Sequence, residues 1–200
     1  DTAPFYCSDK SEEITGIALS QLPRDKFYVS SKINLGTVQG DTSRDAFFRR
    51  LETSLKRLKV DYLDFYHMWC ILSLDSYEKT RDALYGYMLE AKEQGMVRNL
   101  AFSSHLQGAD IEKIIAEDRF KGMLLGYNAL NYRFRQSGIE AAHKKGMGVV
   151  VMNPLGGGVI PKHPDTFRYL AEGTDLSVAQ AGLRFVASHK EITITLSGMT

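Results

Sequence analysis

Four ionisable side chains of this sequence, Asp1, Tyr6, Lys32 and His67, fall within or just after segments that look like β-strands. A lysine ammonium beside a tyrosine favours the phenolate and lowers the tyrosine pKa, so Tyr6 would be a usable acid near neutral pH. An aspartate beside the lysine would keep it charged and aimed, and a histidine could hold a substrate oxygen. Such a set could protonate a carbonyl oxygen while another group delivers hydride.

Each of these residues also has an ordinary explanation. Asp1 fits a solvated turn, Tyr6 a partly buried tyrosine and Lys32 a solvated lysine near a strand end. A lone histidine on an inward face, as expected for His67, is commonly a satisfied core residue. Trp69, two positions later, is first of all a packing residue. The elements that carry these side chains must therefore decide between the explanations.

Residues 61–69 form the strand around which the other elements are arranged. The stretch is rich in aromatic residues, which is typical of a strand, and a predicted helix precedes it in the sequence. Alternation places His67 and Trp69 on one face and Tyr66 and Met68 on the other. Neither face is consistently polar, which indicates a parallel sheet covered by helices.

Helices and strands alternate along the whole sequence. Strands are expected at residues 27–33, 61–69, 97–103, 123–127, 148–152 and 192–196. Helices are expected to begin near Ser11, near Thr42 or Ser43, and near Ser76, Asp110, Gly138 and Ser177. In the first helix, Ile14, Ile17 and Ala18 would form the buried face. Strict alternation predicts a parallel α/β sheet with right-handed crossovers. Polar or glycine-rich residues after successive strands favour a (β/α)8 TIM barrel.

Six whole strands and the tail of a seventh are fewer than the eight that close such a barrel. We therefore expect the TIM barrel to be incomplete, with most of two strands lying before Asp1. On this interpretation the sequence is a fragment of a longer protein, and residues 1–200 form a single partial TIM-barrel domain.

The composition narrows the class of partner. Of the 200 residues, 44% are hydrophobic and 24% charged, which is ordinary for a globular protein. The net charge of +1 gives no indication of a nucleic-acid or membrane partner. No apolar run approaches the ~20 residues of a membrane span, and no signal-peptide pattern is present. Cys7 and Cys70 lack metal-ligand spacing, which predicts a reducing, cytoplasmic location and no metal site.

Five stretches of the sequence are informative together. They are residues 1–6 with 11–14, residues 54–58 with 61–66, residues 95–98 with 102–104, residues 153–157 and residues 183–186. In this order they resemble the motifs DTAxxYxxSEExLG, SLxRLxxDYxDLY, GKVRxxGxSN, SPLxxG and ALRWV of the aldo-keto reductase family. The resemblance covers nearly the whole sequence. Residues 103–105 and the glycine-rich run after Asn153 resemble a prokaryotic-type branch of the family.

The resemblance implies a TIM barrel that reduces a small aldehyde or ketone with NADP(H) or NAD(H). It implies that Tyr6 is the proton donor, that Lys32 tunes it and that Asp1 supports Lys32. The cofactor-binding positions implied by the resemblance are Ser103 and Ser104 for the nicotinamide carboxamide, Met152 for the nicotinamide face, and the backbone of Leu155, Gly156 and Gly157 for the diphosphate.

The sequence also departs from the family pattern. Trp69 stands where the family usually has its histidine, and His67 lies two residues earlier. The histidine role therefore stays open between these positions, and Trp69 is expected to contact the substrate. Gly126 stands where a glutamine usually contacts the carboxamide. Some members of the branch add an iron-sulfur ferredoxin domain, and such a cluster would lie outside this chain.

Two functions from different classes remain. The first is an NAD(P)H-dependent reductase, which the presence of Asp1, Tyr6 and Lys32 at a barrel mouth favours. The second is a cofactor-binding barrel that acts as a non-catalytic regulatory or binding subunit, which the displaced histidine favours. In a third case the fragment itself is inactive because its barrel is open. The sequence leaves the physiological substrate, the choice of NADP or NAD and the oligomeric state open.

Overall fold

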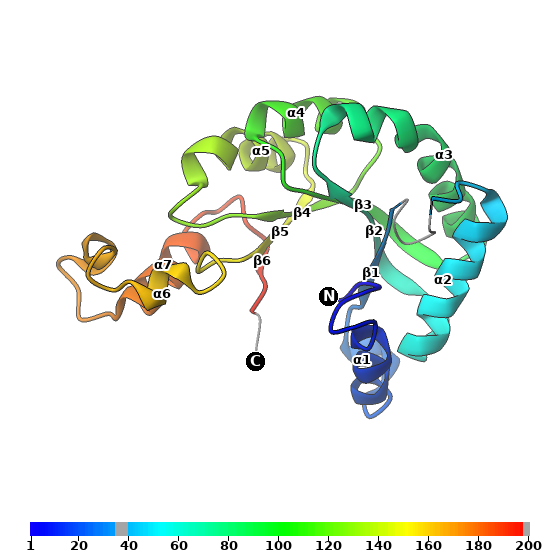
Figure 1. The fold of residues 1–200 in the computed structure, drawn as a ribbon, viewed down its shortest axis with the longest axis horizontal. Helices are drawn as coiled ribbons and strands as arrows, with labels where there is room; N and C mark the ends of the chain where they lie inside the picture. Colours follow the sequence, from blue (N-terminus) through cyan, green and yellow to red (C-terminus); the bar gives the residue numbers. More distant parts are fainter. Residues whose placement is uncertain (35–39, 198–200) are drawn as a thin grey trace. The chain divides into compact units, whose positions relative to one another are not determined.

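The computed structural model describes residues 1–34 and 40–197. The described strands are β1 (Ser30–Ile33), β2 (Leu63–Ile71), β3 (Val97–Ser104), β4 (Gly122–Gly126), β5 (Gly148–Met152) and β6 (Ile194–Thr195) (Figure 1). The helices are α1 (Ser11–Leu19), α2 (Arg44–Leu58), α3 (Leu74–Glu93), α4 (Gly108–Ala116), α5 (Tyr132–Lys144), α6 (Val159–Lys162) and α7 (Val178–Ala187), with short 3-10 turns η1 (Arg24–Lys26) and η3 (Arg168–Ala171). No helix of the described residues is long and apolar enough to cross a membrane.

The six strands form one parallel sheet in the order β1-β2-β3-β4-β5-β6. Lys32 of β1 stands opposite His67 of β2, and Gly126 of β4 stands opposite Met152 of β5. Because a parallel neighbour requires a crossover, this order confirms the alternating α/β architecture of an incomplete (β/α)8 barrel. The first and last strands of this order, β1 and β6, lie within two of the predicted strand segments, residues 27–33 and 192–196.

Several element boundaries differ from those predicted. Strand β1 begins only at Ser30, because the Val29 amide donates to the Asp64 carboxylate (2.9 Å). Strand β2 continues beyond Trp69 to Ile71. Helices α3, α4 and α5 begin earlier than expected, as their bounds show. Helix ends are set by local capping and fray easily, so the shift of about two residues in α3 and α4 is ordinary. Helix α5 is different, because it begins at Tyr132, well before the expected Gly138.

The predicted helix caps are confirmed at two serines and wrong at a third. The Ser43 hydroxyl accepts from the Ala46 amide (3.2 Å), and Ser177 forms a reciprocal capping box with Gln180. Ser11, in contrast, is the first helical residue, and its side chain caps nothing. Its hydroxyl lies 2.7 Å from the Thr2 hydroxyl, so it ties the start of α1 to the first residues of the chain.

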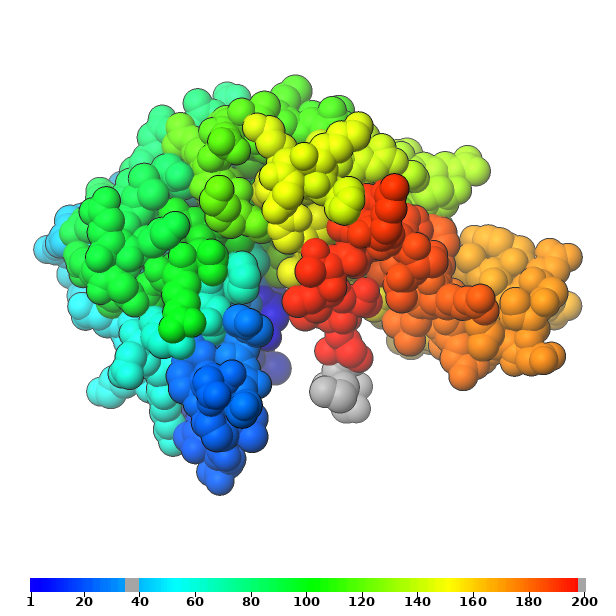
Figure 2. All heavy atoms as spheres, turned by 180° about the vertical axis from the view of Figure 1, so that it is seen from behind, coloured from blue at the N-terminus to red at the C-terminus, as the bar shows by residue number. Residues whose placement is uncertain are grey.

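The chain forms two compact units, residues 1–103 and 104–200. In the first unit α2 and α3 cover one face of β1 and β2, where Tyr66 packs edge-on against Phe47 at 6.0 Å (Figure 1). The second unit is centred on β4 and β5. In the segment after β5, coloured yellow to orange in Figure 2, Ile160 and Phe167 form a small core together with Ala129, and Phe185 of α7 packs against it.

Cation–π contacts and an ion pair hold the N-terminal end of β2 in place. The Tyr62 ring lies between two guanidinium groups, with Arg24 at 3.9 Å and Arg98 at 3.7 Å from its centroid. Arg24 also donates to the buried Asp64 carboxylate (2.7 Å). In parallel α/β barrels this end of a strand serves stability, and the opposite end carries the chemistry.

Helix α1 packs through a glycine rather than through its apolar stripe. The predicted face is wrong, because Ile14 and Ile17 are 59% and 52% exposed and Ala18 is also exposed, whereas Gly16 is buried. A Cβ atom on Gly16 would lie only 2.1 Å from the Arg57 carbonyl oxygen of α2. The two helices therefore touch backbone to backbone; Figure 2 shows α1 in blue beside α2 in cyan.

Candidate active site

Tyr6 lies in the loop before α1, and two of its predicted partners flank its ring. The Trp69 ring meets it edge-on, with centroids 5.7 Å apart. The Lys32 ammonium lies over the Tyr6 ring, 4.9 Å from its centroid. Tyr6 is 36% exposed, so a small molecule can reach it. The loop before α1 and the strands β1 and β2 thus bring Tyr6, Lys32 and Trp69 together.

Lys32 is fully buried and is held by two oxygen atoms. Its Nζ donates to Asp1 Oδ2 (2.8 Å) and to the Thr2 carbonyl (2.6 Å). Burial lowers the pKa of Lys32 to about 7, with the Glu12 carboxylate opposing the shift. Asp1 therefore lies where the sequence expects it, in direct contact with the lysine.

The predicted direction of the Tyr6 pKa shift is wrong. Burial, and then the nearby Cys70 sulfur, raise the pKa of Tyr6 above its ordinary value. The Lys32 ammonium lies over the ring and donates to Asp1 and Thr2, so it gives the hydroxyl no hydrogen bond among the described contacts. Tyr6 consequently stays protonated through the neutral range.

His67 is a core residue in this geometry. It is 4% exposed, and burial, followed by the Lys32 charge, lowers its pKa to about 3. The imidazole is therefore neutral at physiological pH. Of the two candidates for the histidine position, Trp69 is the one whose ring contacts Tyr6.

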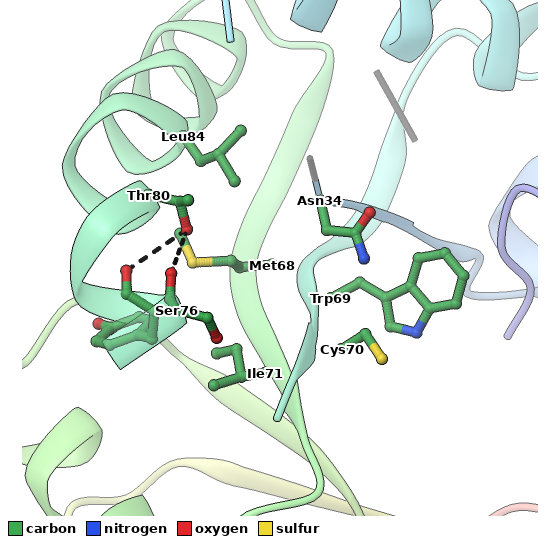
Figure 3. A pocket seen from close by; sticks show the side chains of 9 residues that line it. Asn34, Met68, Trp69, Cys70, Ile71, Ser76, Thr80 and Leu84 are labelled. Carbon is green, nitrogen blue, oxygen red and sulfur yellow. Dashed lines mark hydrogen bonds between the residues drawn. The ribbon is translucent and has the colours of Figure 1, made fainter. Parts of the chain in front are cut away.

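A small cavity of about 160 Å³ opens at the C-terminal end of β2. Its lining residues are Asn34, Met68, Trp69, Cys70, Ile71, Ser76, Tyr77, Thr80 and Leu84. In Figure 3, Met68 and Trp69 project to opposite sides of the strand, as alternation requires. Trp69 thus borders Tyr6 and this cavity at once.

The predicted cofactor positions lie at strand ends. Strand β3 ends in Ser103 and Ser104, both buried, and the Ser104 hydroxyl accepts from the Leu106 amide (3.0 Å). Strand β5 ends at Met152, which is half-buried. In barrels of this class, ligands bind at the C-terminal ends of the strands.

The turn after β5 contains three consecutive glycines, so its backbone is not covered by side chains of its own. Gly156, Gly157 and Gly158 all have positive φ, at 64°, 64° and 89°. The half-buried Leu155 side chain packs against α7, since a Cβ on Gly182 would lie 2.9 Å from it. The Gly157 amide has no hydrogen-bond partner among the described residues. A bare, unpaired amide in such a turn fits an anionic group such as a diphosphate.

A sequence profile of the aldo/keto reductase family matches residues 1–200. The chain belongs to the aldo/keto reductase family. It is 29% identical over 203 residues to the glyoxal reductase of Bacillus subtilis, covering 98% of this chain and 67% of that protein. It is 28% identical over 177 residues to an aldo-keto reductase of Mycolicibacterium paratuberculosis, covering 86% of this chain and 57% of that protein.

Solved structures agree on the fold. The aldo-keto reductase AKR11C1 from Bacillus halodurans, in its holo form, superposes with a TM-score of 0.79 at 20% identity, covering 98% of this chain and 70% of that one. An identity this low speaks for the fold alone. The chain spans about half the length of the first curated relatives that it matches, at 46% and 57% of their residues.

Arg135 lies against Gly126, a contact that the sequence reasoning missed. Arg135 of α5 donates through Nη1 to the Gly126 carbonyl and through Nη2 to the His105 carbonyl (3.1 Å). A Cβ on Gly126 would lie 2.8 Å from Arg135 Nη1, so the glycine makes room for the guanidinium. No spacing in the sequence links these two residues. Among the described residues, no group of three or more His, Cys, Asp or Glu could hold a metal ion.

Proposed function

We propose that this chain carries the catalytic centre of an NAD(P)H-dependent reductase of small aldehydes and ketones. The observation that supports this most directly is the contact of a protonated, accessible Tyr6 with the fully buried Lys32, which Asp1 holds at 2.8 Å. A buried lysine beside a tyrosine and an aspartate has little structural value, because burying a charge costs free energy. Membership of the aldo/keto reductase family supports the same assignment.

The proposed reaction balances with these residues. A reduced nicotinamide held by the residues proposed below would supply the hydride to the carbonyl carbon, with the C=O π electrons moving onto the oxygen. Tyr6 donates its hydroxyl proton to that oxygen, which gives the alcohol and leaves a phenolate. The Lys32 ammonium over the Tyr6 ring stabilises this phenolate, because opposite charges attract and the lysine itself is buried. Bulk water then returns the proton.

For the cofactor we propose Ser103 and Ser104 at the carboxamide, Met152 at the nicotinamide face, and the backbone of residues 155–157 at the diphosphate. The unpaired Gly157 amide supports the last of these. NADP(H) and NAD(H) fit these contacts equally well, because none of them involves the adenosine ribose.

The Gly157→Ala variant should weaken cofactor binding. Gly157 has φ of +64° and a Cβ there would meet nothing within 4 Å, so the change adds strain without a clash. A left-handed alanine costs about 1–2 kcal/mol, which corresponds to about a five- to thirty-fold higher Kd for NADPH if the turn relaxes when empty. Titration of the protein's intrinsic fluorescence with NADPH measures this. The control is Gly173→Ala, at φ of +72° with equally open surroundings, which should bind as the unmodified protein does.

Trp69→Ala should change substrate preference more than it changes turnover of the smallest substrate. The indole borders both Tyr6 and the cavity of about 160 Å³, roughly the space of one aromatic ring. Removing this apolar wall should change the ratio of kcat/KM for benzaldehyde to kcat/KM for glyoxal. The change should correspond to about 1–3 kcal/mol of transition-state binding free energy. Steady-state assays with both aldehydes test it, and an unchanged ratio would exclude Trp69 from the substrate site.

A second candidate is a non-catalytic cofactor-binding subunit, which the presence of Trp69 rather than an imidazole beside Tyr6 favours. One experiment separates the two. The purified protein is mixed with NADPH or NADH and with glyoxal, the substrate named for the Bacillus subtilis relative, and with a set of aromatic and aliphatic aldehydes. Oxidation of the nicotinamide with formation of an alcohol supports the reductase. Saturable cofactor binding without oxidation by any carbonyl supports the subunit.

A further inference from the structure

The loop that carries Tyr6 is held in a conformation that side chains rarely adopt. Phe5, Cys7, Ser8 and Asp9 have φ angles of 70°, 52°, 55° and 65°, all in the left-handed region. None is glycine, so each is disfavoured, and such strain persists only where surrounding structure imposes it. The orientation of Tyr6 therefore depends on contacts made outside its own backbone.

The strongest of these contacts comes from α2. Both carboxylate oxygens of Asp9 accept from the Arg57 guanidinium, at 2.8 Å each. The Phe5 amide donates to Asp9 Oδ1 (3.4 Å), so one carboxylate ties together both ends of the loop. Arg57 lowers the pKa of Asp9 to about 2, which keeps the pair charged at neutral pH. Two parallel, charge-assisted hydrogen bonds fix direction as well as distance.

Arg57 is itself fixed in place. Its carbonyl oxygen lies in the backbone contact with α1, where a Cβ on Gly16 would come within 2.1 Å. Its Nη1 lies 3.5 Å from Oε2 of Glu12, a carboxylate that is 1% exposed. The backbone of Arg57 and its guanidinium are therefore both held in place, and the guanidinium points toward the Tyr6 loop.

The same network extends to the catalytic lysine. The Glu12 carboxylate accepts a 2.6 Å hydrogen bond from the Ser31 hydroxyl, and Ser31 directly precedes Lys32 on β1. Arg50 of α2 lies 3.5 Å from the same carboxylate. Two arginines thus face two carboxylates, and together they connect the Tyr6 loop to the strand that carries Lys32.

We propose that Asp9 and Arg57 are positioning residues that hold the Tyr6 phenol against Trp69 and Lys32. The inference rests on the proposed function, since it concerns the placement of the proposed acid. Neither residue touches the reacting atoms. Each acts through the loop, so its loss should matter only while Tyr6 has a proton to deliver.

The test is a double-mutant cycle. Asp9→Ala and Arg57→Ala are each made alone and together with Tyr6→Phe. Each single change should lower kcat by about ten- to a hundred-fold, because small misplacements of a reacting group cost this much, with the KM for NADPH within about two-fold. In the Tyr6→Phe background the same changes should lower kcat no further. The control is Arg44→Ala, which breaks the comparable Arg44–Glu90 pair elsewhere on α2 and should leave kcat unchanged.

A second readout needs no activity. Trp69 is the single tryptophan of the sequence, and the Tyr6 ring covers one of its edges at 5.7 Å. Asp9→Ala should release Tyr6 and increase quenching of tryptophan fluorescence by acrylamide, whereas Arg44→Ala should not. Should the alanine variants fail to fold, Asp9→Asn and Arg57→Lys, which keep side-chain size but weaken the paired hydrogen bonds, enter the same cycle.

The outcomes separate this inference from the proposed function. If Tyr6→Phe abolishes reduction but Asp9→Ala leaves kcat and quenching as in the unmodified protein, the positioning role is overturned and the reductase stands. If the losses in the double variant add, Asp9 acts by another route and the inference again fails. If Tyr6→Phe retains full activity, the proposed function fails, and increased quenching in Asp9→Ala still shows that the pair holds Tyr6.

Discussion

Tyr6→Phe should lower kcat for carbonyl reduction by about 10²–10⁴-fold, which is the contribution of a positioned general acid. The change removes one hydroxyl group and keeps the ring that packs against Trp69 and Lys32. Cofactor binding should therefore stay within about two-fold, since the residues proposed to hold the dinucleotide lie elsewhere in the chain. Single-turnover reduction with bound NADPH measures the chemical step directly.

The matched control for this variant is Tyr28→Phe. Tyr28 is 83% exposed, so loss of its hydroxyl should change neither kcat nor the melting temperature. Reduction by the Tyr6→Phe protein at close to the normal rate would remove Tyr6 from the mechanism. The proton that is added to the carbonyl oxygen would then have to come from another donor.

Acid should destabilise the protein through His67. The pKa of this buried imidazole is about 3 in the fold and 6.5 ordinarily. Between these values the unfolded chain binds a proton that the folded chain does not. The free energy of unfolding should therefore fall by about 1.4 kcal/mol per pH unit as the pH drops from 6.5 toward 3, in addition to the effect of other groups. Urea unfolding at a series of pH values measures this slope.

His67→Leu should remove that part of the pH dependence, because leucine fills the core and carries no proton. The exposed His163 offers the control, since His163→Leu should leave the slope nearly as it is. If His67→Leu keeps the full slope, the folded imidazole is protonated and does not belong to the core. A loss of kcat of about a hundred-fold in His67→Leu, with stability preserved, would instead give the histidine a part in the acid apparatus.

The sequence predicted the order of elements well because the signals involved are local. Capping serines such as Ser43 and Ser177, and the apolar run of β2, depend on neighbours within a few positions. The packing of α1 could not be predicted in this way. Periodicity identified an apolar stripe at Ile14 and Ile17, but it says nothing of which neighbour a helix meets. Contact with α2 instead required the missing side chain of Gly16.

The family resemblance likewise implied that Asp1 supports Lys32, whereas the electrostatics of the centre depend on the folded structure. The direction of the Tyr6 pKa shift depends on burial and on whether the ammonium points at the hydroxyl or at the ring. The Arg135 guanidinium beside Gly126 was missed for a similar reason. A residue of α5 and the last residue of β4 are brought together only by folding.

The backbone contact between Gly16 and Arg57 has a consequence for how this protein tolerates random mutation. Every side chain larger than hydrogen at position 16 must push α1 away from α2, and with it from Arg57, whose guanidinium binds Asp9. In a saturation library scored by growth or colour, Gly16 should therefore appear as intolerant as Tyr6, although it has no functional group. Substitutions at Gly16 would then lower the score as much as substitutions at Tyr6, although Gly16 takes no part in the reaction. Only a measurement of the amount of folded protein would distinguish the two positions.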